Sequence, residues 1–525
     1  IIIPSCISPP APEIILNPSH GGVMRARFSG LEKKLHSSPR GAATSCDLSR
    51  VYIFMGLFSP GALRISVQYG PADAAQSGLP RDFLSPPILC IILPIVKIIE
   101  IKSGNIDAQL KGLRRGESLT DPALESTVRE IVEDVRTDGD KALFKYTSKF
   151  DRVKLTPGTV KVSQKEFEEA KSRVPKKLRS DLVKAARRVR DFHKRKLPKG
   201  MTFKDGLGNE LGWLIRPIEK AGLYVPGGKA AYPSTVLMTA IPAKVAGVKE
   251  LALVTPCPGG EINPAVLVAA EVAGVDSVYK VGGAQAVAAL AYGTESVPKV
   301  DKIVGPGNIY VTIAKKLVFG VVDIDMIAGP SEVLIIADGS SPAAWVAADL
   351  LAQAEHDEMA VPLVVTQSVR FAREVAKEVE AQLGKLSRKD IAGEAVKNQG
   401  TIFTVKGLDR AVDVANALAP EHLELCVKKP KEILKKIKHA GAIFVGSMST
   451  EAFGDYVAGP SHVLPTGGAA RFSSPLSVYD FLRMPSVISI SEKGFEALSS
   501  SVMNLAYSED LEAHALSVGV RVKGK

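Results

Sequence analysis

The chain has 525 residues, 46% of them hydrophobic and 23% charged, and its formal net charge is +11. This is the composition of a globular protein large enough for two or three domains, each with an apolar core. Aromatic residues form only 6% of the chain, and no basic run is interleaved with them. The charge therefore indicates a solvated basic surface and excludes a nucleic-acid partner.

The five cysteines exclude a disulfide framework and a thiolate metal site. Three lie in the first 99 residues, the other two are Cys257 and Cys426, and the chain contains no C-x-x-C motif. Cys426 stands in the run Leu-Glu-Leu-Cys-Val, which predicts a buried strand. A cysteine in such a place is more often a packing residue than a nucleophile.

Residues 1–100 differ in composition from the rest. The first 99 residues contain 12 of the 34 prolines, 12 serines, and five acidic residues against nine Lys or Arg. A basic, serine-rich, acid-poor N-terminus is typical of an organelle transit peptide, so we expect a disordered targeting segment or a stretch foreign to the mature protein. The apolar run at 88–96 is roughly half as long as a membrane helix and contains Pro94. We expect no membrane partner.

Helical periodicity follows at 121–146 and at 163–197, where Pro175 predicts a break. After that, short apolar strands alternate with helices. Strands are expected at 251–254, 277–281, 302–304, 332–337, 361–366, 401–405 and 442–445, and helices at 265–273, 284–292, 342–355, 369–383, 408–417 and 433–440. Such alternation predicts βαβ units and an α/β fold with two Rossmann-like domains, each with a mainly parallel sheet.

The same pattern predicts the domain boundaries. A helical region at 101–220 precedes the first Rossmann-like domain at 221–335. The second Rossmann-like domain covers 336–474. From about 474 the chain is polar and helical, so we expect residues 475–525 to form a C-terminal helical arm.

Three glycine-rich turns border predicted strands, at 222–228, 282–285 and 305–308. None has the G-x-G-x-x-G pattern of dinucleotide-binding proteins. A nucleotide could still bind at such strand ends, because the N-termini of the following helices attract phosphate. On pattern alone, a nucleotide site and ordinary structural turns both stay open.

Two of the eight histidines are expected to have no catalytic or metal-binding role. His193 stands among Lys and Arg and is expected at the surface, and His439 is expected to end a basic helix, where a cation suits the dipole. Gln353 and His356, three residues apart on one predicted helix, share a face and could together bind a metal such as zinc. By spacing alone, a histidine satisfied by ordinary contacts is the commoner outcome.

Other polar residues that could take part in a reaction lie further along the chain. Glu421 and His422 follow Pro420, and a carboxylate beside an imidazole suits proton transfer, although a helix-capping cluster would look the same. Asp455 and His462 belong to a glycine-rich stretch that predicts one loop, either a binding loop or a solvated turn. Glu509 and His514 lie on the helical tail, where such residues usually have no special role.

Seven segments together resemble the histidinol dehydrogenase family over about residues 121–522. In chain order they read GLYVPGG, VGGAQAVAALAYGTESVPKVDKIVGPGN, AGPSEVLIIAD, ADLLAQAEHD, LAPEHLEL, GDYVAGPSHVLPTGG and EDLEAH. The resemblance implies zinc- and NAD-dependent oxidation of L-histidinol to L-histidine through an enzyme-held aldehyde, by two hydride transfers. It also implies an intertwined homodimer whose C-terminal arm reaches the partner's site. An N-terminal extension of this kind implies a plant member that works in the chloroplast.

The resemblance assigns roles at the matching positions. It implies one zinc ion held by Gln353, His356, Asp455 and His514. Glu421 and His422 match the catalytic pair. Substrate contacts are implied for the four zinc ligands and His422, and also for Ser331, His462 and Glu509. NAD contacts are implied for Tyr224, Gln285 and Asn308.

Two other functions fit parts of the pattern. A zinc hydrolase would use the Glu421–His422 pair to activate water and would need no NAD, so the glycine turns argue against it. A scaffold that binds an imidazole ligand without turnover would not need that pair. A nucleotide-dependent activity separates the first from a dehydrogenase, and any histidine production eliminates the second.

Overall fold

The computed structural model describes residues 51–57, 62–69, 89–92, 95–110, 121–227 and 231–523. The chain divides into two compact units, 1–97 and 98–525. The described part of the first unit is an antiparallel sheet of β1 (Val51–Leu57), β2 (Ala62–Tyr69) and β3 (Leu89–Ile92), in a stretch where the sequence shows no strand period. Residues 1–50, which carry much of the transit-peptide prediction, lie outside the described residues.

After β4 (Lys97–Glu100), the second unit continues with helices. They are α1 (Ile106–Gln109), α2 (Pro122–Asp138), α3 (Asp140–Asp151), α4 (Pro157–Val160), α5 (Gln164–Arg173) and α6 (Lys176–Arg195). The helical pattern predicted at 121–146 is confirmed, and Gly139, at a φ of 54°, divides it into α2 and α3. The predicted break at Pro175 is confirmed, between α5 and α6. Of these, α2, α3, α5 and α6 pack on the helices of the first Rossmann-like sheet, whereas α1 packs on α14 (Leu408–Leu418) of the second.

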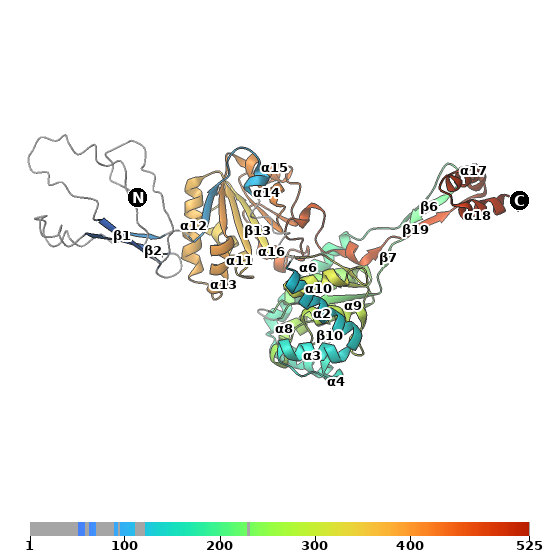
Figure 1. Ribbon diagram of the computed structural model, residues 1–525, viewed down its shortest axis with the longest axis horizontal. Helices are drawn as coiled ribbons and strands as arrows, with labels where there is room; N and C mark the ends of the chain where they lie inside the picture. The colour runs from blue at the N-terminus through green and yellow to red at the C-terminus, as the bar shows by residue number, and fades with distance from the viewer. Residues whose placement is uncertain are drawn as a thin grey trace, which may run out of the picture. The chain divides into compact units, whose positions relative to one another are not determined.

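The first Rossmann-like sheet has the strand order β10-β9-β8-β11-β12 and is parallel throughout. Its strands are β8 (Lys220–Tyr224), β9 (Glu250–Val254), β10 (Ser277–Tyr279), β11 (Lys302–Val304) and β12 (Asp323–Ile324), and its helices are α7 (Pro233–Ala246), α8 (Pro264–Ala273), α9 (Gly283–Tyr292) and α10 (Ile309–Val318). Helices cover the sheet in Figure 1. Leu251 and Leu253 join one apolar core while Ala252 and Val254 join the other, as the period of two in a strand requires.

The second sheet has the order β17-β16-β13-β14-β15-β4, and β13 to β17 are parallel. Its strands are β4 (Lys97–Glu100), β13 (Glu332–Ala337), β14 (Val361–Thr366), β15 (Thr401–Thr404), β16 (His422–Cys426) and β17 (Ala442–Val445). Its helices are α11 (Ala343–Ala354), α12 (Val369–Leu383), α13 (Lys389–Gln399), α14 (Leu408–Leu418), α15 (Pro430–Leu434) and α16 (Glu451–Tyr456). The helix predicted at 433–440 is wrong, because α15 ends at Leu434. His439 therefore ends no helix.

The structure confirms the predicted α/β class with two mainly parallel sheets. The domain boundaries stay predictions. The expected boundary at 335/336 would divide β13, all of which belongs to the second sheet. Cys426 is confirmed as a buried residue of β16.

A ribbon and two helices make up the end of the chain. The ribbon pairs β19 (Ser486–Ser489), β6 (Glu210–Trp213) and β5 (Met201–Lys204) in antiparallel order, and α17 (Glu492–Ser508) packs on α18 (Glu512–Lys523). The predicted polar, helical tail thus contains a strand, β19, and this strand pairs with β6 from much earlier in the chain. Its helices also expose apolar side chains, at Leu498, Val502, Leu505, Leu511, Leu516, Val520 and Val522. Among the described residues, no helix is both long and apolar enough to cross a membrane.

Candidate active site

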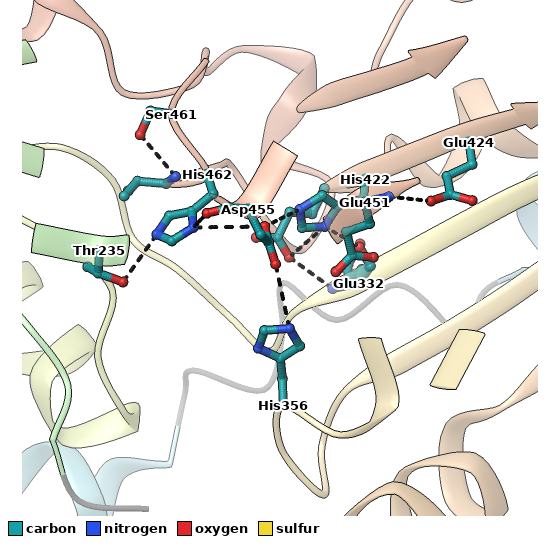
Figure 2. A network of polar contacts seen from close by, with 11 residues as sticks. Thr235, Glu332, His356, His422, Glu424, Glu451, Asp455, Ser461 and His462 are labelled. Carbon is teal, nitrogen blue, oxygen red and sulfur yellow. Dashed lines mark hydrogen bonds and ion pairs between the residues drawn. The ribbon is translucent and has the colours of Figure 1, made fainter. Parts of the chain in front are cut away.

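Polar side chains gather at the amino ends of the central strands of the second sheet. Glu332 and His422 begin β13 and β16, and His422 pairs with Val333 in the parallel register. The helix α11 follows β13 and returns along the sheet, which brings its last turn, with Gln353, back to this edge. Figure 2 shows the cluster that results. It therefore lies at the opposite edge from the carboxyl ends where ligands usually bind in such sheets.

His422 is buried and presents one nitrogen without a partner. Its Nδ1 atom lies 3.0 Å from the carbonyl oxygen of Glu332, and because that oxygen can only accept, the proton belongs on Nδ1. Among the described residues, Nε2 has no hydrogen-bond partner, and its nearest acid is Asp455, at 3.9 Å. Burial lowers the pKa of His422 to about 4. The imidazole is therefore neutral near pH 7, with a free lone pair on Nε2.

Glu421 lies beside this imidazole and is also buried. Its Oε2 atom accepts the N–H of Glu332 at 2.9 Å and lies 3.8 Å from His422 Nδ1. Burial raises the pKa of Glu421 well above its ordinary value. The capping alternative is wrong, because Glu421 follows the end of α14 and leads into a strand. Ala419 holds a left-handed φ of 51° just before it, a strained conformation that often accompanies functional residues.

The carboxylate of Asp455 stands among three imidazoles. Its oxygens lie 3.7 Å from His356 Nε2, 3.9 Å from His422 Nε2 and 3.8 Å from His462 Nδ1. His462 is fixed at both ends, by the carbonyl oxygen of Asp455 at 3.0 Å and by the hydroxyl of Thr235 at 3.1 Å. The single loop predicted for 454–462 is wrong in part, because Asp455 belongs to α16.

Gln353 and His356 come together, although not on one regular helix. The helix ends at Ala354, and the N–H of His356 bonds to the carbonyl of Gln353 at 3.2 Å in a final tight turn. Sequence reasoning missed two acids of the cluster, Glu332 and Glu451. Each is an acidic residue at the first position of an element that leads into the site, and that placement was the available signal.

The donors present fit a zinc ion. His356, Glu451 and Asp455 each offer a ligand atom, and these atoms lie within 4.8 Å of one another. Imidazole, carboxylate and amide oxygen are suitable zinc donors. Within the described part of the chain, no Lys or Arg forms an ion pair with Glu421, Glu451 or Asp455. A divalent cation would compensate the charge of these buried acids.

The predicted NAD contacts lie at the carboxyl edge of the first sheet. Tyr224 ends β8, and its hydroxyl accepts the N–H of Gly283 at 3.0 Å. Asn308 caps α10 directly after β11, the neighbour of β8. The strand order reverses between β8 and β11, which is the switch point where doubly wound sheets bind nucleotides. Gln285 lies in the first turn of α9 with a buried amide oxygen that has no partner among the described residues.

Three predicted positions remain. Ser331 directly precedes β13 at the edge that carries the cluster, and its carbonyl accepts the N–H of Val361. Glu509 and His514 are exposed in the arm, and their described bonds stay within α17, α18 and their junction. A single chain therefore does not bring them to the cluster. The surface position predicted for His193 is wrong, because that side chain is fully buried.

The chain is similar to known proteins of one family. The family model described as histidinol dehydrogenase matches residues 114–522. The histidinol dehydrogenase of Syntrophotalea carbinolica is 51% identical over 82% of this chain and 100% of its own length, and that of Aquifex aeolicus is 53% identical over 78% and 94%. A crystal structure of histidinol dehydrogenase from Elizabethkingia anophelis superposes with a TM-score of 0.77 at 37% identity, over 82% of this chain and 98% of that one.

Proposed function

This chain belongs to the histidinol dehydrogenase family, and from that premise we propose how its residues carry out the reaction. Membership establishes an enzyme of histidine biosynthesis that oxidises histidinol with NAD, which removes the hydrolase and scaffold alternatives. The observation that carries the mechanism is the unpartnered Nε2 of a neutral, buried His422 in an acid-lined site.

The first proton transfer belongs to His422. Its Nδ1–H is committed to the Glu332 carbonyl, which leaves Nε2 as the acceptor for the hydroxyl proton of histidinol. The O–H bond breaks as a hydride leaves the carbon that bears the hydroxyl and passes to NAD, and the product is the aldehyde. Because proton and hydride leave together, a base within hydrogen-bond reach of the hydroxyl lowers the barrier.

Glu421 takes part in the second half of the reaction. As a carboxylate it accepts a proton from the water that adds to the aldehyde, which gives the hydrated form. A second hydride then leaves for NAD and the acid is formed. A buried carboxyl with a raised pKa is a stronger base once ionised than an exposed one. The balance is one histidinol, one water and two NAD to one histidine, two NADH and three protons.

We propose that zinc is the resident metal. Gln353, His356 and Asp455 would hold it, and His514 of a second copy of the chain would complete the set. When bound, zinc supplies a template that orients the substrate through its imidazole and amine. His462, fixed by Thr235 and by the backbone of Asp455, is placed to contact the substrate, as is Ser331.

We propose a homodimer in which the arm of each chain completes the other's site. The support is that Glu509 and His514 have no described contact with the cluster of their own chain. The arm also leaves seven large aliphatic side chains on α17, α18 and their junction exposed. Exposed apolar side chains gathered on one pair of helices favour a protein–protein interface.

We further propose plastid targeting. The family match begins at residue 114, and the residues before it include the basic, serine-rich and acid-poor segment. A fusion of residues 1–113 to a fluorescent protein, expressed in leaf cells, should accumulate in plastids. Diffuse fluorescence in the cytosol would contradict the proposal.

The deciding experiment follows NADH absorbance at 340 nm with L-histidinol and NAD. We expect two NADH for each histidine formed, loss of the activity on chelation and its return when zinc is added. If the untreated enzyme contains no zinc and is insensitive to chelators, the metal assignment fails. If a folded, zinc-loaded enzyme forms no NADH, the proposed dehydrogenase mechanism fails as a whole.

A further inference from the structure

We infer that Glu451 is a positioning residue, whose carboxylate holds the amide of Gln353 so that the amide oxygen is directed to the metal. This inference rests on the proposed role of Gln353 as a zinc ligand. It concerns an acid that lies outside the proton-transfer pair and outside the proposed ligand set.

The first step is the orientation of the Gln353 amide. One arm of this buried amide lies 3.0 Å from the Glu332 carbonyl oxygen and 3.2 and 3.3 Å from the two carboxylate oxygens of Glu451. It also lies 3.2 Å from His422 Nδ1, so the amide and the imidazole share the Glu332 carbonyl as an acceptor. A carbonyl oxygen can only accept a hydrogen bond, and the carboxyl oxygens beside it also offer lone pairs. The arm that faces them must therefore be the NH₂ group. The planar amide then places its oxygen on the opposite side, away from Glu451.

The second step is the support of Glu451 itself. Glu451 is the first residue of α16 and only 2% exposed, and its N–H donates to the carboxylate of Glu424 at 2.7 Å. Asp455 follows four residues later on the same short helix, so both side chains lie on one face. Figure 2 shows Glu451 and Asp455 side by side next to His422. One helix thus carries a proposed ligand together with the group that orients a ligand on α11.

The alternative role for Glu451 is direct coordination, because its carboxylate lies within 4.8 Å of the donors of His356 and Asp455. The two roles make different demands on the side chain. Holding the amide requires an acceptor oxygen at the end of a side chain of this length. Coordination or charge compensation requires the negative charge.

Two conservative variants separate these demands. Glu451→Gln keeps the length and one acceptor oxygen but loses the charge, whereas Glu451→Asp keeps the charge but withdraws it by one methylene. Zinc affinity is measured by competition with a chromophoric chelator, and metal-free stability by thermal unfolding. Loss of an orienting partner typically weakens a metal site about 10–100-fold. We expect a loss of that size in Glu451→Asp and less than about threefold in Glu451→Gln.

A second comparison uses Gln353→Ala. In that background Glu451→Asp should weaken zinc no further, because no amide is left to orient. Equal or reversed losses in the two Glu451 variants, or additive losses with Gln353→Ala, would overturn the inference. Wild-type protein that binds no zinc would instead refute the proposed metal site. At limiting free zinc, kcat/KM with histidinol should fall in parallel with zinc affinity.

Discussion

The replacement of His422 by Asn tests the assignment of the base most directly. The amide nitrogen of an asparagine side chain lies close to where the imidazole carries Nδ1, so the hydrogen bond to the Glu332 carbonyl can survive. The substitution removes Nε2, the atom with no partner among the described residues. The variant therefore retains the anchor and loses only the proton acceptor.

The expected effects on rate and on stability differ widely. Loss of a general base slows turnover about 10²–10⁴-fold, which corresponds to roughly 3–5 kcal/mol of activation free energy. The stability effect is smaller, about 1 kcal/mol, because one polar side chain replaces another and the main hydrogen bond persists. His422 is outside the proposed ligand set, so zinc content should stay at the wild-type level.

The assay is NADH formation at saturating histidinol and NAD, with zinc content and thermal unfolding measured on the same preparation. His439→Asn is the matched control, because it makes the same change at a partly exposed histidine outside the cluster. Turnover in His422→Asn within about threefold of wild type, in a protein that binds zinc normally, would refute the role of Nε2.

Three further predictions concern the NAD site, the buried acids and the dimer. Gly305→Ala should weaken NAD binding at least tenfold in calorimetry and leave zinc binding intact, because the added Cβ would lie 2.1 Å from the Tyr224 carbonyl oxygen at a φ of 119°. Gly320→Ala is the control, because Gly320 has a similar φ of 101° but lies in open space. Equal NAD affinities of the two variants would contradict the switch-point site. Burial raises the pKa of Glu424 to about 9, so between its ordinary value and pH 9 the folded protein keeps a proton that the unfolded chain has lost. The free energy of unfolding of the metal-free protein should then fall as pH rises through this window, and Glu424 alone contributes up to about 1.4 kcal/mol per pH unit. Glu424→Gln should make the slope shallower by that amount, and parallel slopes would disprove the assignment. Inactive His514→Ala and Glu421→Gln proteins, mixed under subunit exchange, should regain partial NADH formation, and no recovery with verified heterodimers would argue against the shared site.

Sequence patterns predicted much of the fold because they report local periodicity. The predicted strands at 302–304, 332–337 and 361–366 match β11, β13 and β14 residue for residue. The predicted environment of one histidine was wrong because it was inferred from the flanking residues. His193 was expected at the surface because basic residues flank it, yet it continues the stripe of Leu182, Ala186 and Val189 on the buried face of α6. A strict helical period would have placed it inside.

The sequence by itself determined the α/β class and the two mainly parallel sheets, and it named candidate site residues whose roles stay predictions. It did so because each strand and each capped turn depends on near neighbours in the chain. The tertiary structure alone decided which of these residues meet. Only the parallel register of β13 and β16 places the Glu332 carbonyl against His422 Nδ1 and leaves Nε2 free. Only the return of α11 and α16 to the amino edge adds Gln353, Glu451 and Asp455, because residues far apart in sequence carry no local signal of their approach.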